Sequence, residues 1–361
     1  MAPTQHREKR PVIVLGATGA VGQRFVQLLD NHPWFDLVAV AASERSEGKS
    51  YEQASHWILS GDIPEAAAKL IVSPLDPAAF GLSDEQQPIA FSALPADVAA
   101  EVEPRFAEAG YAVCSNASAF RYEPDVPILV PDVNPSHIEI LPVQRANRGW
   151  PGFIATNPNC TTAGMSVVLK PLDDAFGLRK VFAATLQAIS GAGYPGVPSI
   201  DITDNVVPWI SGEEDKMARE SAELLGRVDA GRIAPAEFQL TAHAHRVPVV
   251  DGHTVCLSLG FEKPPSPEEA LEVLRSFRTP DVVAGLPSAP ETSIRLLDAP
   301  DRPQPRLDRD AGRGMTVSVG RVRSCPVLDL RLVLVSHNTI RGAAGGSIVN
   351  AELLVASGAV S

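Results

Sequence analysis

The sequence lacks the features of several large classes of protein. Its four cysteines, Cys114, Cys160, Cys256 and Cys325, form no CxxC pair and no Cys/His ligand cluster. That pattern argues against a disulfide framework or a structural zinc site and suits a reducing compartment. No apolar stretch approaches the length of a transmembrane helix, and the polar segment 1–10 has no apolar core of a signal peptide. We therefore expect a cytoplasmic protein.

Positive charge is also scarce, because the net charge is −12. This charge argues against nucleic acid or an anionic membrane as the main partner and leaves small molecules as the expected ligands. The sequence has no internal repeat, no P-loop and no HExxH motif, so no metal is expected. What remains is an ordinary globular composition, with 45% hydrophobic and 20% charged residues. A chain of 361 residues is long enough for about two domains.

The first motif joins a strand, a glycine-rich turn and a helix. The apolar run 11–15 reads as a buried strand, the segment GATGAVG follows at 16–22, and a helical apolar stripe continues to Leu29. This order is typical of a dinucleotide-binding fold, in which the pyrophosphate lies against the start of the helix. We therefore predict cofactor contacts at Gly16, Thr18, Gly19, Ala20, Val21 and Gly22.

The next predicted strand, 37–42, should end near the adenosine ribose of the cofactor. An NAD-specific site usually places an acidic residue at that point. Here Ser43 ends the strand and Arg45 and Ser46 follow, which suits a 2′-phosphate and predicts NADP. Glu44 leaves some use of NAD open, and the alternative for the basic residues is a solvated loop.

Alternating strands and helices in the first half predict a parallel, doubly wound sheet, with strands at 71–72, 89–92 and 112–115 and a helix at 96–109. In the second half the strands are expected at 181–189, 244–250, 254–262, 315–323 and 328–336, and the helices at 213–225 and 268–277. Short connections there predict a mostly antiparallel sheet backed by helices, an α+β domain with a broad face for a dimer partner. A hairpin is expected at Asp251-Gly252-His253. The segment 280–314 is expected to be a surface excursion, and a last helix is expected at 343–354.

Cys160 lies at a predicted strand-to-helix junction between the strand 153–156 and a helix that runs from Thr161 to about Phe176. Asn159 is a good helix-capping residue. The unpaired N–H groups and the positive dipole end of the helix favour a thiolate and could stabilise an oxyanion. The sequence thus indicates a catalytic nucleophile, and the alternative is a small buried hydrophobic residue.

A thiol nucleophile needs a proton-transfer partner and groups that hold its substrate. His253 is the best candidate base, with His243 and His245 as competitors. Arg246 lies seven residues earlier, so a tight hairpin could bring it into the same pocket, where it could bind a carboxylate. A pair three residues apart at a helix start, Glu213 and Lys216, could bind an ammonium group and an anion, although a solvated pair is the simpler reading.

Taken together, the motifs resemble the aspartate-β-semialdehyde dehydrogenase family, most closely its archaeal and fungal form. The resemblance covers nearly the whole chain from Val12 onward. It rests on GATGAVG at 16–22, SAFR at 118–121, NPNCTT at 157–162, QAISGAGYPG at 187–196, GEEDK at 212–216, Arg246 with DGHT at 251–254, PQPRLDRDAG at 303–312 and NTIRGAAGG at 338–346. Several motifs in the right order are far more specific than one glycine fingerprint.

The resemblance implies roles for particular residues. Cys160 would be the nucleophile, His253 the general acid/base, and Gln187 would orient the acyl group. The substrate would be bound by Arg246 at its α-carboxylate, by Glu213 at its amino group, and by Arg121, Asn159 and Lys216 at its phosphate. Ser92, Gly193 and Asn338 would join the first glycine loop in holding NADP.

The implied reaction converts β-aspartyl phosphate to aspartate β-semialdehyde through a cysteine thioester, with NADPH as hydride donor. The implied organisation is an NADP-binding domain at 1–156, completed by 338–361, and a catalytic and dimerisation domain at 157–337, in a homodimer or tetramer. An acyl-CoA reductase such as malonyl-CoA reductase is the main alternative. An N-acetyl-glutamyl-phosphate reductase is weaker because Glu213 would meet no amine, and a non-catalytic NADP-binding protein would have lost the cysteine or the histidine.

Overall fold

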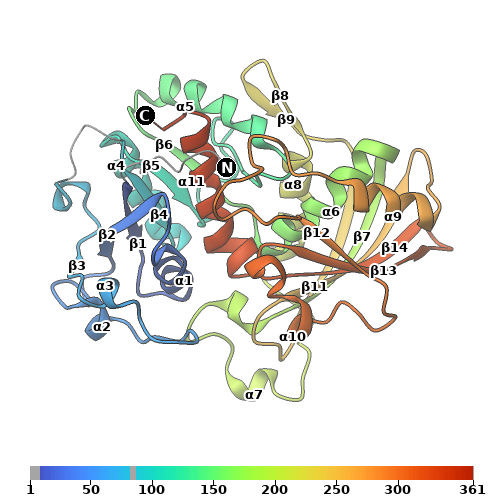
Figure 1. Cartoon of the computed structure of the whole chain (residues 1–361), viewed down its shortest axis with the longest axis horizontal. Coiled ribbons are helices and arrows are strands. Elements are labelled where there is room, and N and C mark those ends of the chain that lie inside the picture. Colours follow the sequence, from blue (N-terminus) through green and yellow to red (C-terminus); the bar gives the residue numbers. More distant parts are fainter. Residues whose placement is uncertain (1–8, 82–86, 361) are drawn as a thin grey trace, which may run out of the picture.

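The computed structural model describes residues 9–81 and 87–360, so residues 1–8 of the polar first segment lie outside the described residues. Two six-stranded sheets lie side by side, the first at the left of Figure 1 and the second at the right. Within the described ranges, no helix is long and apolar enough to cross a membrane. Among the same described residues, no cluster of three or more His, Cys, Asp or Glu side chains could hold a metal ion.

The first sheet is entirely parallel, in the order β3-β2-β1-β4-β5-β6. Its strands are β1 (Arg10–Leu15), β2 (Phe35–Ala41), β3 (Val72–Ser73), β4 (Ile89–Ser92), β5 (Ala112–Ser115) and β6 (Phe153–Thr156). The strand order reverses direction between β1 and β4, which creates the crevice where cofactors bind in such sheets. The predicted doubly wound sheet is thus confirmed.

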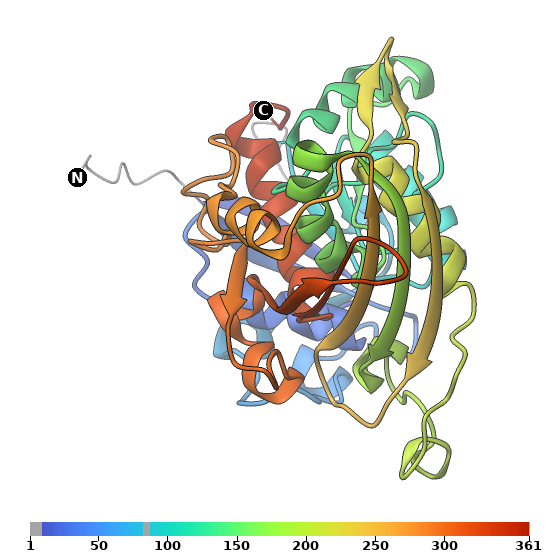
Figure 2. The ribbon, with the colours of Figure 1, turned by 90° about the vertical axis from the view of Figure 1, so that its right-hand side faces the viewer.

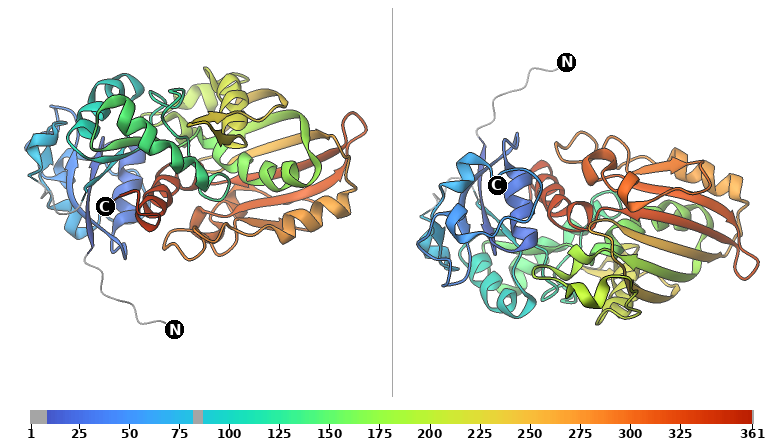
Figure 3. Two further views of the ribbon diagram at one scale, coloured as in Figure 1. Left: turned by 90° about the horizontal axis from the view of Figure 1, so that it is seen from above. Right: turned by 90° about the horizontal axis from the view of Figure 1, so that it is seen from below.

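Helices cover both faces of this sheet, which explains why its strands are mostly apolar. In β1, Val12 and Val14 share a core with α1 (Ala20–Leu29) and α11 (Gly345–Ala356), whereas Ile13 and Leu15 pack with α4 (Ala96–Glu108). The chain's last helix therefore returns to the first sheet, and both views of Figure 3 show it at the junction of the two halves. Shorter helices are α2 (Tyr51–Ala54), α3 (Glu65–Ala68) and α5 (Leu141–Arg148).

The second sheet is mixed, which corrects the prediction of a mostly antiparallel one. Its order is β10-β7-β11-β14-β13-β12, and its strands are β7 (Leu178–Gln187), β10 (Gln239–Arg246), β11 (His253–Phe261), β12 (Ile294–Leu297), β13 (Val317–Ser324) and β14 (Leu330–Ser336). The pairs β10–β7 and β12–β13 are parallel, and the other neighbouring pairs are antiparallel. The predicted surface excursion 280–314 contains β12, which extends the sheet instead.

The predicted hairpin between β10 and β11 is also wrong, because β7 lies between these two strands. The connection crosses the end of β7, where Val247 donates a backbone hydrogen bond to Gln187 and Ile189 donates one to Val249. Strand spacing along the chain could not reveal the crossing, since β7 precedes β10 by about 50 residues. As a result, β7 and β10 end, and β11 begins, at the same end of the sheet.

One face of the second sheet is covered by α6 (Cys160–Phe176), α8 (Glu213–Leu224) and α9 (Pro267–Ser276). The other face carries an open apolar groove of about 690 Å³, in which Phe182 and Val327 are exposed. Figure 2 views the molecule from the side of this sheet, with its strands in front. Shorter elements include α7 (Ser199–Ile202), α10 (Pro305–Asp308) and the hairpin of β8 (Arg227–Asp229) with β9 (Arg232–Ala234).

Candidate active site

A cleft of about 720 Å³ runs between the two halves of the molecule. It extends from the first glycine loop to the start of α6 and the start of α8. The predicted site residues that line it are Gly16, Thr18, Gly19, Ala20, Val21, Ser43, Arg121, Asn159, Cys160, Gly193, Glu213, Lys216 and Asn338. Segments far apart in the sequence therefore converge on one cavity.

Other predicted cofactor residues lie outside the lining of this cleft. Gly22 packs beneath the glycine loop, where an added Cβ would lie 2.2 Å from the carbonyl oxygen of Gly16. Ser92 is fully buried at the end of β4. Arg45 and Ser46 belong to the turn that follows β2, in which Arg45 is exposed.

The glycine loop has the shape needed to hold a pyrophosphate. Gly16 adopts a positive φ of 75°, and a Cβ there would lie 2.8 Å from the carbonyl oxygen of Ala93. Gly19 caps the start of α1, and Ala20 and Val21 of the first helical turn line the cleft beside it. The backbone N–H groups at the start of a helix can bind an anion. The buried Tyr51 hydroxyl donates a 2.9 Å hydrogen bond to the carbonyl of Ala17 and so fixes the loop from behind. These residues fit a dinucleotide cofactor.

Cys160 is the first residue of α6, so the helix begins one residue before the predicted start at Thr161 and the predicted strand-to-helix junction is present. The Asn159 side-chain oxygen caps the helix by accepting hydrogen bonds from the N–H groups of Thr161 (3.0 Å) and Thr162 (3.3 Å). The prediction of unpaired N–H groups around the cysteine is therefore wrong for these two. They are used by the cap and cannot serve an oxyanion at the same time.

His253 lies beside Cys160, with 3.2 Å between its Nε2 atom and the cysteine Sγ atom. Its Nδ1 atom accepts a 3.0 Å hydrogen bond from the backbone N–H of Ala188. A neutral imidazole that accepts at Nδ1 carries its proton at Nε2, so the ring donates to the sulfur. The competitors lie elsewhere: His243 is exposed on β10, and the His245 ring is bonded to the carbonyl of Thr185.

Burial raises the pKa of the Cys160 thiol to about 12, and the nearby charge of Glu213 acts in the same direction. Burial also lowers the pKa of His253 to about 3, with a further contribution from Arg246. At neutral pH the unliganded pair is therefore a thiol and a neutral imidazole. This corrects the prediction of a resting thiolate, because desolvation outweighs the helix start and the arginine charges.

The raised pKa predicts how the free thiol reacts. Below its pKa, the thiolate fraction of a thiol grows tenfold for each pH unit. We expect alkylation of Cys160 by iodoacetamide in the unliganded protein to accelerate about tenfold per unit between pH 7 and pH 9, without a plateau. The rate can be followed by the mass of the Cys160 peptide. A plateau reached near pH 7 would contradict the site described here.

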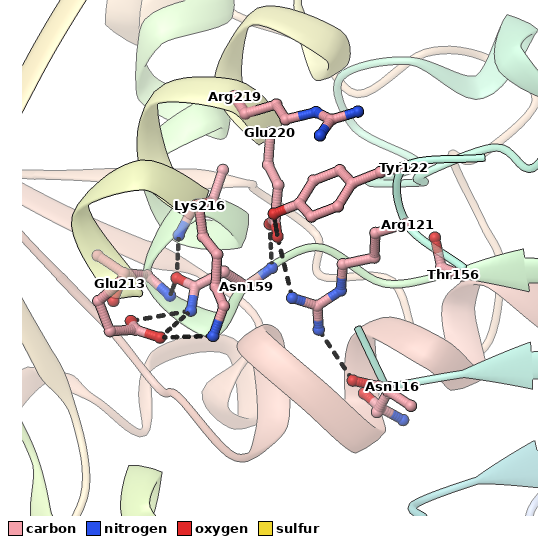
Figure 4. Close-up of polar contacts among 12 residues, drawn as sticks. Asn116, Arg121, Tyr122, Thr156, Asn159, Glu213, Lys216, Arg219 and Glu220 are labelled. Carbon is pink, nitrogen blue, oxygen red and sulfur yellow. Dashed lines mark hydrogen bonds and ion pairs between the residues drawn. The ribbon is translucent and has the colours of Figure 1, made fainter. Parts of the chain in front are cut away.

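Glu213, at the start of α8, accepts hydrogen bonds from two other side chains of the site (Figure 4). Its carboxylate accepts hydrogen bonds from the Asn159 Nδ2 atom at 2.8 and 2.9 Å and from the Gln187 Nε2 atom at 3.2 Å. The Nζ atom of Lys216, one helical turn further, lies 3.7 Å from the Oε1 atom of Glu213. The carboxylate thus holds the Asn159 side chain that caps the helix of the nucleophile, while Glu213 and Lys216 share one face, as their spacing predicts.

Arg246 and Gln187 end neighbouring parallel strands and are paired in register. The buried Arg246 donates a 2.7 Å hydrogen bond to the carbonyl of Ala188, the residue whose N–H binds His253. Gly191 covers both side chains, since a Cβ there would lie 2.7 Å from Arg246 Nη1 and 3.3 Å from His253 Nε2. The predicted proximity of Arg246 and His253 is present, although β7 rather than a hairpin produces it.

Two further side chains fix parts of the cleft. Arg121 donates from Nη2 to the carbonyl of Asn116 (2.8 Å) and from Nη1 to Glu220 (3.0 Å). Asn338 accepts a 2.8 Å bond from the N–H of Gly252 and donates a 2.8 Å bond to the Ser190 hydroxyl. Asn338 therefore joins the segment after β14 to the turn before His253.

Sequence reasoning gave no role to two residues that shape the site. Gly342 lies in a π-helical turn at Ile340–Ala344, and a Cβ there would come within 2.7 Å of the Cys160 Cβ atom. No sequence signal marks such a close approach. Glu220 is fully buried on α8, and its spacing of seven residues from Glu213 could have placed it on the same helix face.

Family models match both halves of the chain. The model described as semialdehyde dehydrogenase, NAD binding domain, matches residues 11–141, and the model described as semialdehyde dehydrogenase, dimerisation domain, matches residues 169–341. The aspartate-semialdehyde dehydrogenase of Archaeoglobus fulgidus is 52% identical, covering 95% of this chain and 97% of that protein. The one from Candida albicans is 47% identical, covering 95% and 97%.

Solved structures give the same result. The crystal structure of aspartate semialdehyde dehydrogenase with NADP from Candida albicans has a TM-score of 0.88 and 46% identity, covering 97% of this chain and 99% of that chain. The structure of aspartate semialdehyde dehydrogenase II complexed with ASA from Vibrio cholerae has a TM-score of 0.73 and 29% identity, covering 97% and 99%.

Proposed function

This chain belongs to the aspartate-semialdehyde dehydrogenase family, and from that premise we propose the roles of its site residues. The chain is an NADP-dependent oxidoreductase that converts β-aspartyl phosphate reversibly to aspartate β-semialdehyde and phosphate. Such enzymes serve amino-acid biosynthesis, including that of lysine, threonine and methionine. The observation that carries the proposal is the 3.2 Å contact of Cys160 with His253 at the end of the dinucleotide cleft.

Each charged group of the substrate is bound by a side chain of opposite charge. Arg246 binds its α-carboxylate and Glu213 its amino group, because both side chains are buried close to Cys160, Glu213 in the lining of the cleft and Arg246 behind it. Arg121 and Lys216 bind the phosphate, and both line the cleft. Asn159 joins them at the phosphate, although its amide nitrogen already faces Glu213.

The first glycine loop would hold NADP together with Ser43, Gly193 and Asn338, which line the same cleft, and Arg45 of the turn after β2 would assist Ser43. The exposed turn after β2 leaves Glu44 free to point to solvent. When bound, the reduced cofactor supplies a hydride to the carbonyl carbon. Ser92 would act on the cofactor only indirectly, because it is buried and its carbonyl accepts a 2.9 Å hydrogen bond from the N–H of Asn116, which lines the cleft.

Cys160 begins the reaction by attacking the acyl carbon of β-aspartyl phosphate. A carbon–sulfur bond forms and the bond to phosphate breaks, so the thiol proton leaves with the phosphate and a thioester remains. Arg121 and Lys216 stabilise the departing charge. After reduction, the carbon–sulfur bond breaks, the aldehyde is released, and one proton from solution restores the thiol.

His253 acts on the sulfur both when the thioester forms and when the aldehyde is released. Its Nε2–H donates to Sγ, which stabilises the thiolate as it forms and as it leaves. The proton that the departing sulfur needs passes through the same atom. Gln187 is fixed by Glu213 and Thr185, and it orients the acyl group beside the nucleophile.

A second copy of the chain is the expected partner. The family model for residues 169–341 is a dimerisation domain, and the open face of the second sheet lies within that range. We propose a homodimer through this face, and a tetramer built from such dimers is the alternative. The proposed domains are 1–156 with 338–361, and 157–337, and a cytoplasmic location stays a prediction.

The proposed substrate is tested by measuring NADPH oxidation with purified protein. β-Aspartyl phosphate is expected to support turnover, and malonyl-CoA is expected to support none. NADH, tested in parallel, is expected to be a poorer donor because Ser43, and no acidic residue among those described, lines the cleft directly after β2. Activity with the thioester alone would overturn the proposal in favour of an acyl-CoA reductase.

A further inference from the structure

Glu220 is a fully buried carboxylate that joins two parts of the site (Figure 4). Its Oε1 atom accepts hydrogen bonds from Arg121 Nη1 (3.0 Å) and from the Tyr122 hydroxyl (3.3 Å). Its Oε2 atom accepts a hydrogen bond from the backbone N–H of Asn159, the residue that caps the helix of the nucleophile. One side chain of α8 therefore holds both a cleft-lining arginine and the start of α6.

Only a carboxylate can make these contacts together. A glutamine has the same shape, but it presents one acceptor and one donor atom. Whichever way it is turned, its amide N–H groups would face either the Arg121 guanidinium or the Asn159 N–H, which are both donors. A buried carboxylate is stable only when it is paired and hydrogen-bonded, and here Arg121 supplies the opposite charge.

The remaining contacts of Arg121 define what Glu220 does to it. Nη2 is bonded to the carbonyl of Asn116, so two of the three nitrogens of the guanidinium have fixed partners on different segments. The plane of the group is thereby set while it lines the cleft. Tyr122 is fixed in turn by Arg219, whose guanidinium carbon lies 3.8 Å from the centre of the ring.

We propose that Glu220 is a positioning residue that orients Arg121 for phosphate and anchors Asn159 ahead of Cys160. The inference rests on the proposed function, because it assumes that Arg121 binds the phosphate. Glu220 does not contact the substrate and acts through its two partners. Its loss should therefore weaken the handling of phosphate selectively, which a general structural role would not do.

The reverse reaction separates these effects, since inorganic phosphate and the aldehyde are distinct substrates with their own KM values. Glu220→Gln is expected to raise the KM for phosphate about tenfold or more, because Arg121 loses a charge-assisted hydrogen bond. The KM values for aspartate semialdehyde and NADP should stay within about twofold, although kcat should fall. Glu272→Gln, which removes an exposed carboxylate paired with Arg275 on α9, is the matched control and should leave the KM for phosphate unchanged.

A double-mutant cycle tests whether Glu220 acts through Arg121. In an Arg121→Ala background, Glu220→Gln should add little to the KM for phosphate, because the partner is already absent. Full additivity, or an unchanged KM for phosphate in the single variant, would overturn the inference. If Glu220→Gln does not fold, Tyr122→Phe decides, with an expected rise of about two- to threefold in the KM for phosphate and no rise as the contrary result. A wild-type protein without phosphate-dependent turnover would instead contradict the proposed function.

Discussion

Replacing Cys160 with serine is expected to lower kcat by at least about 10⁴-fold while NADP binding stays intact. A hydroxyl is a far weaker acid than a thiol, and burial at this position already raises the pKa of the thiol to about 12. The serine would be harder still to deprotonate in the same surroundings. The glycine loop lies at the other end of the cleft, so the cofactor should bind with unchanged affinity.

Steady-state kinetics measure the loss of kcat, and a fluorescence titration with NADPH measures the affinity for the cofactor. Cys256→Ser is the matched control, because Cys256 is exposed on β11 and lies outside the lining of the cleft. That variant should keep wild-type turnover. Turnover near the wild-type rate in Cys160→Ala would rule out the thioester mechanism altogether.

Replacing His253 with glutamine is expected to lower kcat by about 10²- to 10⁴-fold. The glutamine amide can still donate a hydrogen bond toward the sulfur, but it cannot release a proton to it. The variant therefore separates proton transfer from simple hydrogen bonding. Because burial lowers the pKa of His253 to about 3, the wild-type imidazole of the unliganded protein is neutral above about pH 5.

The measurement is a pH profile of kcat for both proteins between pH 5 and pH 9. His243→Ala is the control, since His243 is exposed on β10 and outside the cleft lining. That variant should behave as wild type. A glutamine variant that kept more than about a tenth of the wild-type kcat would show that proton transfer at this position is dispensable.

Local patterns in the sequence were sufficient for the first half of the fold. Strand β1 and helix α1 were predicted from an apolar run, a glycine loop and a helical stripe, because each of these is a property of neighbouring residues. The start of α6 was predicted in the same way from Asn159 and the strand before it. The cap is present in the structure with the expected acceptor atom.

The topology of the second sheet depends on contacts that no local pattern records. β7 inserts between β10 and β11, so residues about 60 positions apart pair while the expected hairpin does not form. The same holds for the ionisation of the site. Burial of Cys160 and His253 by segments such as Gly191 and Gly342 sets their pKa values, and the sequence predicted only the opposing effect of the helix start.

The central claim, that Cys160 carries the acyl group, is tested most directly by a single turnover without reduced cofactor. The protein is mixed with β-aspartyl phosphate and oxidised NADP, and both released phosphate and protein mass are followed. The account predicts a burst of about one phosphate per active chain and an aspartyl adduct on the Cys160 peptide. No burst, or an adduct on another residue, would contradict it.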